Sequence, residues 1–309
     1  MGDAGSEAGR GIERGAVKAN DLEFGYLAAG PEGGPLALCL HGFPDSAYTW
    51  RHLLPELAEA GYRAVAPFMR GYAPTAIPED GAYQTAALAA DANALHAALG
   101  GGPDAVLIGH DWGAAATYGA ARRSPESWST VITLALPPLG ALAGSFFGYE
   151  QLKRSFYIFL FQTPLAEAAL DRAFVDGLWR DWSPAQARDE DGRAANVGHV
   201  MDCLAAPENR AAAIGYYRAM LDPSRHVPRY AADQRAEGEV GERPILYLHG
   251  ADDGCLGVDA VAPGGDVSGV LARLPAGSRA EVVPDVGHFL HLDRPAEVNA
   301  RILAWIASG

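Results

Sequence analysis

Two glycines that flank an aspartate constrain the fold of this chain more than any other feature. They occur in the run Gly-His-Asp-Trp-Gly at 109–113, with Asp111 at its centre. An apolar run precedes it and a small-residue helical pattern follows, so a strand is expected to turn sharply into a helix here. Such a turn lifts the central side chain clear of the backbone. An ordinary turn or helix cap would fit the same five residues. If Asp111 is instead a nucleophile, its carboxylate indicates alkyl transfer and not acyl transfer.

The composition indicates a soluble globular chain of 309 residues with a large core. Its formal charge of −14 disfavours nucleic acid and anionic membranes as partners, because a negative surface repels phosphates. No apolar stretch is long enough to span a membrane. Cys39, Cys203 and Cys255 lack the spacing of a disulfide framework or a zinc site, which fits a location in the cytoplasm. Residues 1–16 are rich in Gly, Ala and Glu and predict a disordered tail.

Short β-rich runs alternate with longer helical patterns, which predicts an α/β fold with a mostly parallel sheet between two layers of helices. The predicted strands cover 22–27, 36–40, 64–67, 105–108, 131–135, 245–248 and 280–283. The predicted helices cover 50–60, 84–99, 114–122 and 296–307. Between Pro138 and Pro228 the alternation stops, and the segment becomes aromatic and helical. We expect an inserted helical cap at 139–228, between core segments 17–138 and 229–309, with most of its aromatic side chains in a second hydrophobic core.

An acid and a histidine follow the last two predicted strands. Asp253 lies just beyond the sixth strand and His288 lies in the loop after the seventh. The chain order Asp111, acid, base is that of the α/β-hydrolase architecture, in which the acid orients the imidazole and the imidazole faces the nucleophile. Asp252 competes for the role of the acid and His291 for that of the base. The spacing favours Asp253 and His288.

The run His-Gly-Phe-Pro at 41–44 follows the predicted strand 36–40. A turn here can direct the backbone N–H of Phe43 into the same space as the N–H of Trp112, and two such donors can hold an oxyanion. The bond between Phe43 and Pro44 is a candidate for the cis isomer, which occurs in tight functional turns. An ordinary proline turn is the alternative. We expect Phe43 and Trp112 to form an oxyanion hole.

From about residue 21 onward, the chain resembles the epoxide hydrolases of the α/β-hydrolase superfamily. The resemblance rests on the runs at 41–44 and 109–113 and on the loop from Gly-His-Phe at 287–289 onward. It implies an eight-stranded α/β-hydrolase sheet and two cap tyrosines that bind the epoxide oxygen. Segments similar to those that supply the tyrosines assign them to Tyr157 and Tyr217, with Tyr216 as the adjacent alternative.

The resemblance implies covalent catalysis without a metal or an organic cofactor. Asp111 attacks an apolar epoxide while Tyr157 and Tyr217 donate to the leaving oxygen. Water activated by His288, which Asp253 orients, then hydrolyses the ester to a vicinal diol. A haloalkane dehalogenase would use the same nucleophile, acid and base, but usually carries Asn where this chain has the oxyanion phenylalanine. A non-catalytic binding protein of the same fold is the remaining alternative. The chain is expected to be a monomer or a homodimer.

Overall fold

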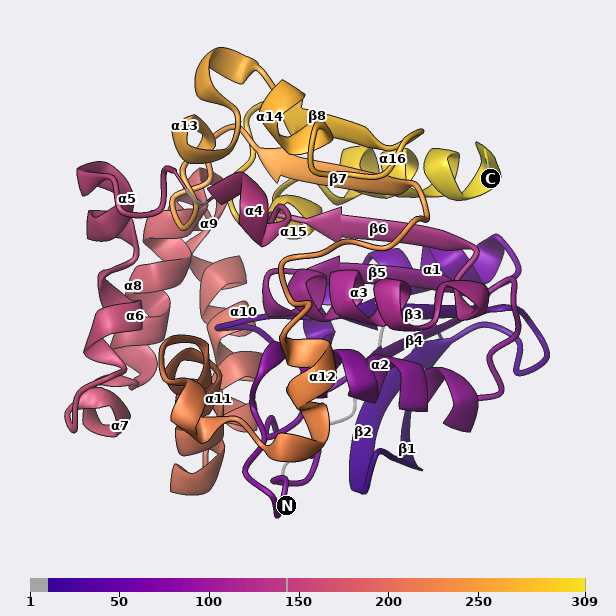
Figure 1. Ribbon diagram of the computed structural model, residues 1–309, viewed down its shortest axis with the longest axis horizontal. Coiled ribbons are helices and arrows are strands. Elements are labelled where there is room, and N and C mark those ends of the chain that lie inside the picture. The colour runs from indigo at the N-terminus through magenta and orange to yellow at the C-terminus, as the bar shows by residue number, and fades with distance from the viewer. Residues whose placement is uncertain (1–10, 143, 309) are drawn as a thin grey trace.

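An eight-stranded sheet forms the centre of the molecule (Figure 1). The computed structural model describes residues 11–142 and 144–308. In this part of the chain the strand order is β1-β2-β4-β3-β5-β6-β7-β8; the β1–β2 and β2–β4 pairs are antiparallel and all other pairs are parallel. The strands are β1 (Glu13–Ala19), β2 (Leu22–Ala29), β3 (Leu36–Leu40), β4 (Arg63–Pro67), β5 (Val106–His110), β6 (Thr130–Leu134), β7 (Ile245–Gly250) and β8 (Arg279–Val283). The predicted mostly parallel sheet is confirmed.

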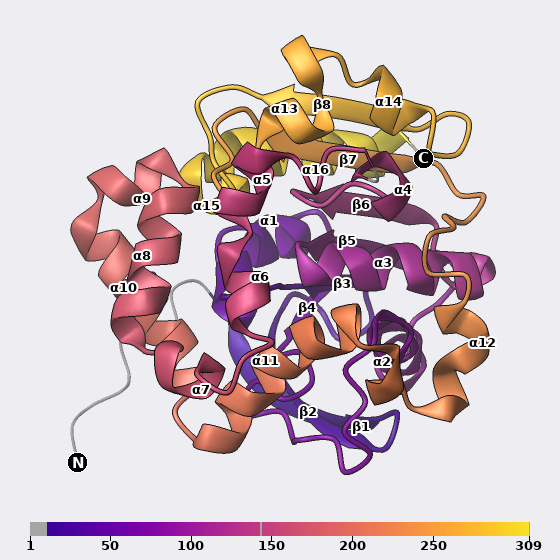
Figure 2. The same cartoon turned by 60° about the vertical axis from the view of Figure 1, so that its left-hand side comes forward.

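A run of helices lies between β6 and β7, as the interrupted alternation predicted. It contains α4 (Leu139–Leu142), α5 (Tyr149–Arg154), α6 (Phe156–Leu160), α7 (Ala166–Ala169), α8 (Arg172–Trp182), α9 (Pro184–Arg188), α10 (Glu190–Cys203) and α11 (Pro207–Leu221). Figures 1 and 2 show α5 to α11 gathered beyond the ends of the strands. The chain therefore has a helical insertion consistent with a cap, and 139–228 stays our proposal for its limits.

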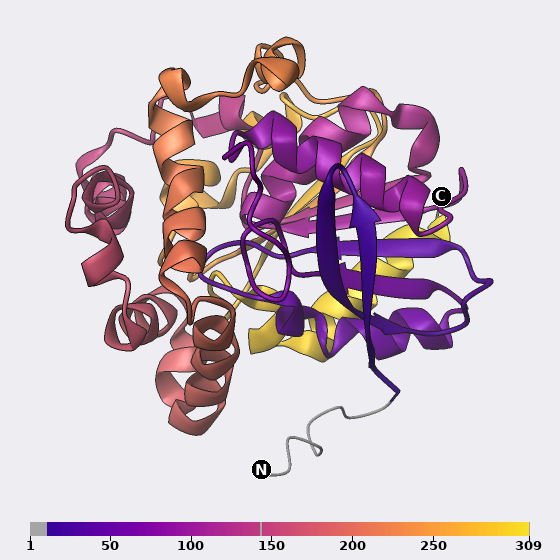
Figure 3. The same cartoon turned by 90° about the horizontal axis from the view of Figure 1, so that it is seen from below.

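Helices cover both faces of the sheet (Figure 3). On one face α2 (Thr85–Ala98) packs against α3 (Trp112–Arg123), and on the other α1 (Leu53–Glu59) packs against α16 (Pro295–Ser308). Shorter helices occur in the connections after the cap: α12 (Ala231–Gln234), α13 (Val258–Val261), α14 (Ser268–Leu271) and α15 (Leu290–Asp293). Among the described residues, none of the helices combines the length and the apolar character that crossing a bilayer requires.

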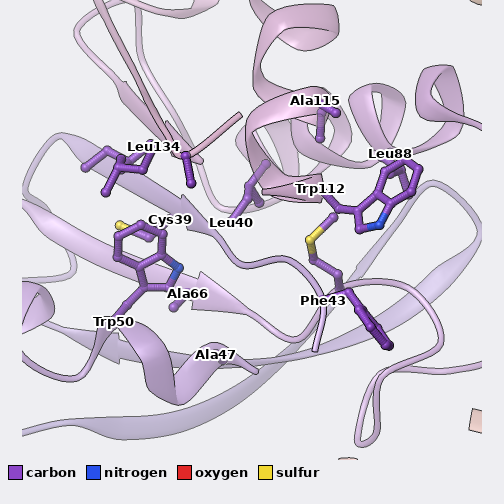
Figure 4. Close-up of a cluster of buried hydrophobic side chains, with 14 of the residues drawn as sticks. Cys39, Leu40, Phe43, Ala47, Trp50, Ala66, Leu88, Trp112, Ala115 and Leu134 are labelled. Carbon is purple, nitrogen blue, oxygen red and sulfur yellow. The ribbon is translucent and has the colours of Figure 1, made fainter. Parts of the chain in front are cut away.

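The hydrophobic core reaches from the sheet to the edge where Asp111 lies. Strands β3, β5, β6 and β7 are buried at every residue, as expected for a parallel sheet covered on both faces. Figure 4 shows Cys39, Trp50 and Leu134 in one buried cluster that also contains Phe43 and Trp112. The residues predicted to form the oxyanion hole are therefore anchored in the core by their own side chains.

The amino-terminal segment differs from the prediction. The disordered tail expected at 1–16 is too long, because Glu13–Ala19 forms β1 and pairs with β2, so the core begins before residue 17. The two strands are joined at Asn20 and Asp21, both with positive φ, as in a two-residue hairpin turn. β1 is an edge strand with exposed polar residues, so it lacks the apolar run that marks the other strands. The remaining tail residues, 1–10, lie outside the described part of the chain.

Candidate active site

Asp111 lies at the turn between β5 and α3. Its backbone has φ 53° and ψ −119°, a strained conformation for a residue other than glycine. A Cβ atom on Gly109 would lie 2.2 Å from the carbonyl oxygen of Gly113, and one on Gly113 would lie 2.2 Å from the carbonyl oxygen of Leu40. Close approach of the backbone is therefore the reason that glycine occupies both flanking positions.

Backbone amides and a histidine surround the Asp111 carboxylate. The Phe43 N–H, in the turn after β3, donates to Oδ1 at 2.8 Å, and the peptide bond that follows Phe43 is cis. Gly42 permits this approach, since a Cβ there would lie 2.3 Å from Oδ1. Burial raises the pKa of Asp111, whereas His288 and the amides of Phe43 and Trp112 stabilise its charged form. The other carboxylate oxygen, Oδ2, lies 3.8 Å from His288 Nε2.

Asp253 forms a hydrogen bond with the His288 imidazole. Its Oδ2 lies 3.0 Å from His288 Nδ1, and its Oδ1 accepts the N–H groups of Cys255 at 2.8 Å and Leu256 at 2.9 Å. Burial raises the pKa of Asp253, but His288 and these hydrogen bonds outweigh burial and lower it below its ordinary value. Burial lowers the pKa of His288, but the carboxylates of Asp253 and Asp111 outweigh burial and raise it. The pair is therefore built to stabilise an imidazolium.

The two competing residues lie in other surroundings. Asp252 is exposed at the surface, whereas Asp253 is 1% exposed. His291 is buried, and its Nε2 lies 2.5 Å from the hydroxyl oxygen of Thr49. It does not line the cavity that contains the nucleophile, whereas His288 does. The geometry therefore favours Asp253 and His288.

Tyr157 on α6 and Tyr217 on α11 face the same cavity, with their ring centroids 5.4 Å apart. The Tyr217 hydroxyl has no hydrogen-bond partner among the described residues, and that of Tyr157 lies 3.6 Å from Cys255 Sγ. Burial raises the pKa of both phenols well above the ordinary value, so both keep their protons at neutral pH. The alternative, Tyr216, donates its hydroxyl to the carbonyl oxygen of Arg70 at 2.8 Å and does not line the cavity.

A cavity of about 350 Å³ brings Asp111, Trp112, Tyr157, Tyr217 and His288 together. Most of its other lining is apolar and comes from both the cap and the core, including Leu136, Leu142, Phe146, Ile158, Met220 and Leu256. A larger cleft of about 570 Å³ lies beside α5 and the loop after β7, but it is lined by charged side chains and reaches neither the nucleophile nor the histidine. The smaller cavity is therefore the candidate active site, and it suits an apolar ligand.

Two residues that the sequence did not mark hold the histidine loop in place. His110, next to the nucleophile, has its Nε2 2.9 Å from the carbonyl oxygen of His288. The carbonyl oxygen of Trp182, at the end of α8, accepts the N–H of His288 at 2.9 Å and that of Gly254 at 3.1 Å. The position of His110 inside the 109–113 motif was a usable signal, but nothing in the sequence marked Trp182.

Comparisons with known proteins agree with this architecture. Residues 35–295 match the family model described as alpha/beta hydrolase fold. The chain is 30% identical to epoxide hydrolase A of Mycobacterium tuberculosis (strain ATCC 25618 / H37Rv), over 94% of this chain and 96% of that protein. It is 37% identical to epoxide hydrolase 4 of Mus musculus, over 94% of this chain and 78% of that protein. The crystal structure of epoxide hydrolase A from Mycobacterium thermoresistibile superposes with a TM-score of 0.73 at 26% identity, over 95% of this chain and 98% of that one. The chain therefore belongs to the α/β-hydrolase fold family and, within it, to the epoxide hydrolase group.

Proposed function

We propose that this protein is an epoxide hydrolase that converts an apolar epoxide to a vicinal diol through an ester on Asp111. One observation carries the proposal: a carboxylate at the elbow shares an apolar cavity with two phenols that keep their protons and with a histidine. The carboxylate supplies a nucleophile for carbon, and the phenols supply protons for an oxygen leaving group. Relatives named epoxide hydrolases support the same substrate class.

In the first step Asp111 opens the ring. Its Oδ1 is held by the Phe43 N–H, which leaves Oδ2 free to attack an epoxide carbon from the side opposite the C–O bond. A new C–O bond forms, the ring C–O bond breaks, and its electron pair stays on the epoxide oxygen. Tyr157 or Tyr217 gives this oxygen a proton, because an alkoxide is a stronger base than a phenolate, and the other hydroxyl donates a hydrogen bond.

In the second step water hydrolyses the ester. The distance of 3.8 Å between His288 Nε2 and Asp111 Oδ2 is too long for a direct hydrogen bond and can accommodate a water positioned by Nε2. His288 takes a proton from the water while its oxygen attacks the ester carbonyl carbon. The N–H groups of Phe43 and Trp112 stabilise the oxyanion, at about 3 kcal/mol for each donor. The ester C–O bond then breaks, and the departing diol oxygen takes the second proton of the water from the hydroxyl of the tetrahedral intermediate, so that Asp111 is a carboxylate again. The diol leaves, and the proton on His288 returns to the tyrosinate.

The two phenols separate this proposal from the haloalkane dehalogenase alternative. A halide leaves without a proton, so its displacement does not need a proton donor opposite Asp111. The test is a parallel assay of the purified protein on styrene oxide, 1-bromobutane and p-nitrophenyl acetate. We expect phenylethanediol from the first substrate at rates well above those on the other two. Faster bromide release would favour the dehalogenase, and binding without turnover of any substrate would favour a non-catalytic protein.

A further inference from the structure

Next to His288, outside the substrate cavity, three buried side chains bring polar atoms together. Asp45 precedes the short 3-10 helix η1 (Ala47–Trp50), His110 ends β5, and His291 lies on α15. None of the three is more than 2% exposed. One potential ligand atom from each lies within 4.8 Å of the other two. The reaction proposed above gives the Asp45–His291 pair no role.

Each of the three side chains leaves one atom without a hydrogen-bond partner in the described structure: Asp45 Oδ2, His110 Nδ1 and His291 Nδ1. The state of the His110 ring follows from its neighbour. Its Nε2 lies 2.9 Å from the carbonyl oxygen of His288, which can only accept, so Nε2 carries the hydrogen. In the neutral ring, His110 Nδ1 is therefore a lone pair, and it has no partner among the described residues.

His291 is also hydrogen-bonded through its other ring nitrogen. The hydroxyl oxygen of Thr49 lies 2.5 Å from His291 Nε2, and either atom can be the donor. If Thr49 accepts from the Nε2–H group, His291 Nδ1 is a lone pair; if Thr49 donates, Nδ1 carries the hydrogen. In the first of these states Asp45 Oδ2, His110 Nδ1 and His291 Nδ1 are all buried acceptors without a partner among the described residues, which is costly.

We propose that Asp45, His110 and His291 form a binding site for a divalent transition metal ion of the Zn²⁺ or Co²⁺ type. Two imidazole nitrogens and one carboxylate oxygen are a common ligand set for these ions. Both histidines already hydrogen-bond through the other ring nitrogen, the arrangement that orients metal-bound imidazoles. The carboxylate of Asp45 offsets part of the ion's charge. The positive charge of Arg51, which lowers the pKa of both Asp45 and His291, disfavours binding of a cation.

The geometry requires a small closure on binding. Bonds of about 2.0–2.1 Å in a tetrahedral site place ligand atoms about 3.3 Å apart, so the widest pair must approach by side-chain rotation. Because the three side chains are buried, we expect slow uptake through local opening.

Metal at this site would act on His288, a consequence that rests on the proposed function. The rings of His110 and His288 have centroids 4.7 Å apart, and His110 also bonds the His288 carbonyl oxygen. Rotation of His110 onto an ion would shift the hydrogen bond that holds the His288 loop and so move His288 relative to Asp111. We therefore expect bound metal to slow ester hydrolysis and to make the ester on Asp111 accumulate.

The direct test measures binding of Co²⁺ alone. The purified chain is incubated with Co²⁺ for several hours, freed of excess ion by gel filtration, and analysed for metal content and visible absorption. We expect one tightly held ion per chain with the absorption of four-coordinate Co²⁺. The His291→Gln and Asp45→Asn variants should bind about 10- to 100-fold more weakly or not at all. The His226→Gln variant, which removes a half-buried histidine elsewhere, should bind like the parent.

Circular dichroism and thermal unfolding establish that each variant is folded. If neither cluster variant folds, the melting temperature of the parent protein tests whether it binds Co²⁺. This temperature should rise with Co²⁺ concentration. Absence of retained Co²⁺ in the parent, or equal retention by the parent and a folded cluster variant, would overturn the site. A Co²⁺-loaded parent that hydrolyses styrene oxide at the metal-free rate would overturn the link to His288. Failure of the proposed function would appear instead as no epoxide turnover in the metal-free protein.

Discussion

Removal of the Tyr217 hydroxyl has a matched control in the adjacent residue, Tyr216. Both phenols are buried on α11, but only Tyr217 faces Asp111 across the cavity. Its hydroxyl donates to no acceptor among the described residues, so Tyr217→Phe leaves no buried acceptor unsatisfied. The Trp112 side chain, which interacts with this hydroxyl, is the one group that the change would affect. We expect the free energy of unfolding to change by less than about 0.5 kcal/mol.

The cost of Tyr217→Phe should appear in the reaction instead. The developing alkoxide loses one of two donors, and a donor to a transition-state oxyanion is worth about 2.7–4 kcal/mol, or about 100- to 1,000-fold in kcat. Tyr216→Phe should do the opposite. It removes the donor to the Arg70 carbonyl oxygen, which costs about 1–3 kcal/mol of stability, and it leaves ring opening close to the parent rate.

The assay combines initial rates of diol formation from styrene oxide with urea unfolding of the same preparations. Tyr157→Phe and the double variant with Tyr217→Phe complete the series, and the double variant should lose epoxide opening altogether. Parent-like rates for Tyr217→Phe together with a large loss for Tyr216→Phe would show that our assignment is wrong and that Tyr216 is the proton donor. Parent-like rates for the double variant would remove the phenols from the mechanism.

Three further predictions test the rest of the site. His288→Gln should open the epoxide but not hydrolyse the ester, so mass spectrometry should find the substrate mass added to the peptide that contains Asp111; an unmodified peptide despite substrate binding would contradict covalent catalysis. The carboxylates of Asp253 and Asp111 raise the pKa of His288, and in the ester, where Asp111 is uncharged, Asp253 is the main one that remains. Ester hydrolysis should be lost as the pH falls through this pKa, and Asp253→Asn should move this limb of the pH–rate profile to lower pH; an unmoved limb would argue against the pairing. Gly113→Ala places a Cβ 2.2 Å from a backbone oxygen and should destabilise the fold by about 1–3 kcal/mol or more, whereas Gly33→Ala meets no atom within 4 Å and should not; equal melting temperatures would contradict the packing argument.

The sequence predicted seven of the strands because each is a short apolar run between turn residues. β1 was missed because it has no apolar run, and only its position directly before a two-residue turn and β2 could have indicated a strand. The residues of β1 are small or charged and most are exposed, and the stronger signal was the turn at Asn20 and Asp21, where two adjacent residues tolerate positive φ. Edge strands need no apolar run, since one side of the ladder and much of the outer surface face solvent.

A residue of the candidate site could be predicted from the sequence where the local backbone geometry requires particular neighbouring residues. Asp111 sits in a turn that only its two flanking glycines allow, and this requirement is visible in the sequence. The choice between Tyr216 and Tyr217 depends on how the cap helix is rotated against the core, which no local pattern encodes. The cluster of Asp45, His110 and His291 joins three segments far apart in the chain, so its existence follows only from the fold.

Isotope transfer in a single turnover tests the covalent ester on Asp111 most directly. Excess protein reacts once with styrene oxide in water enriched in oxygen-18, and the label is then measured in the diol and in the peptide that contains Asp111. The ester mechanism predicts labelled Asp111 and an unlabelled diol, because water attacks the carboxyl carbon and the diol receives an oxygen of the carboxylate. A labelled diol with an unlabelled Asp111 would mean that water attacks the epoxide directly, and the mechanism proposed for this protein would be wrong.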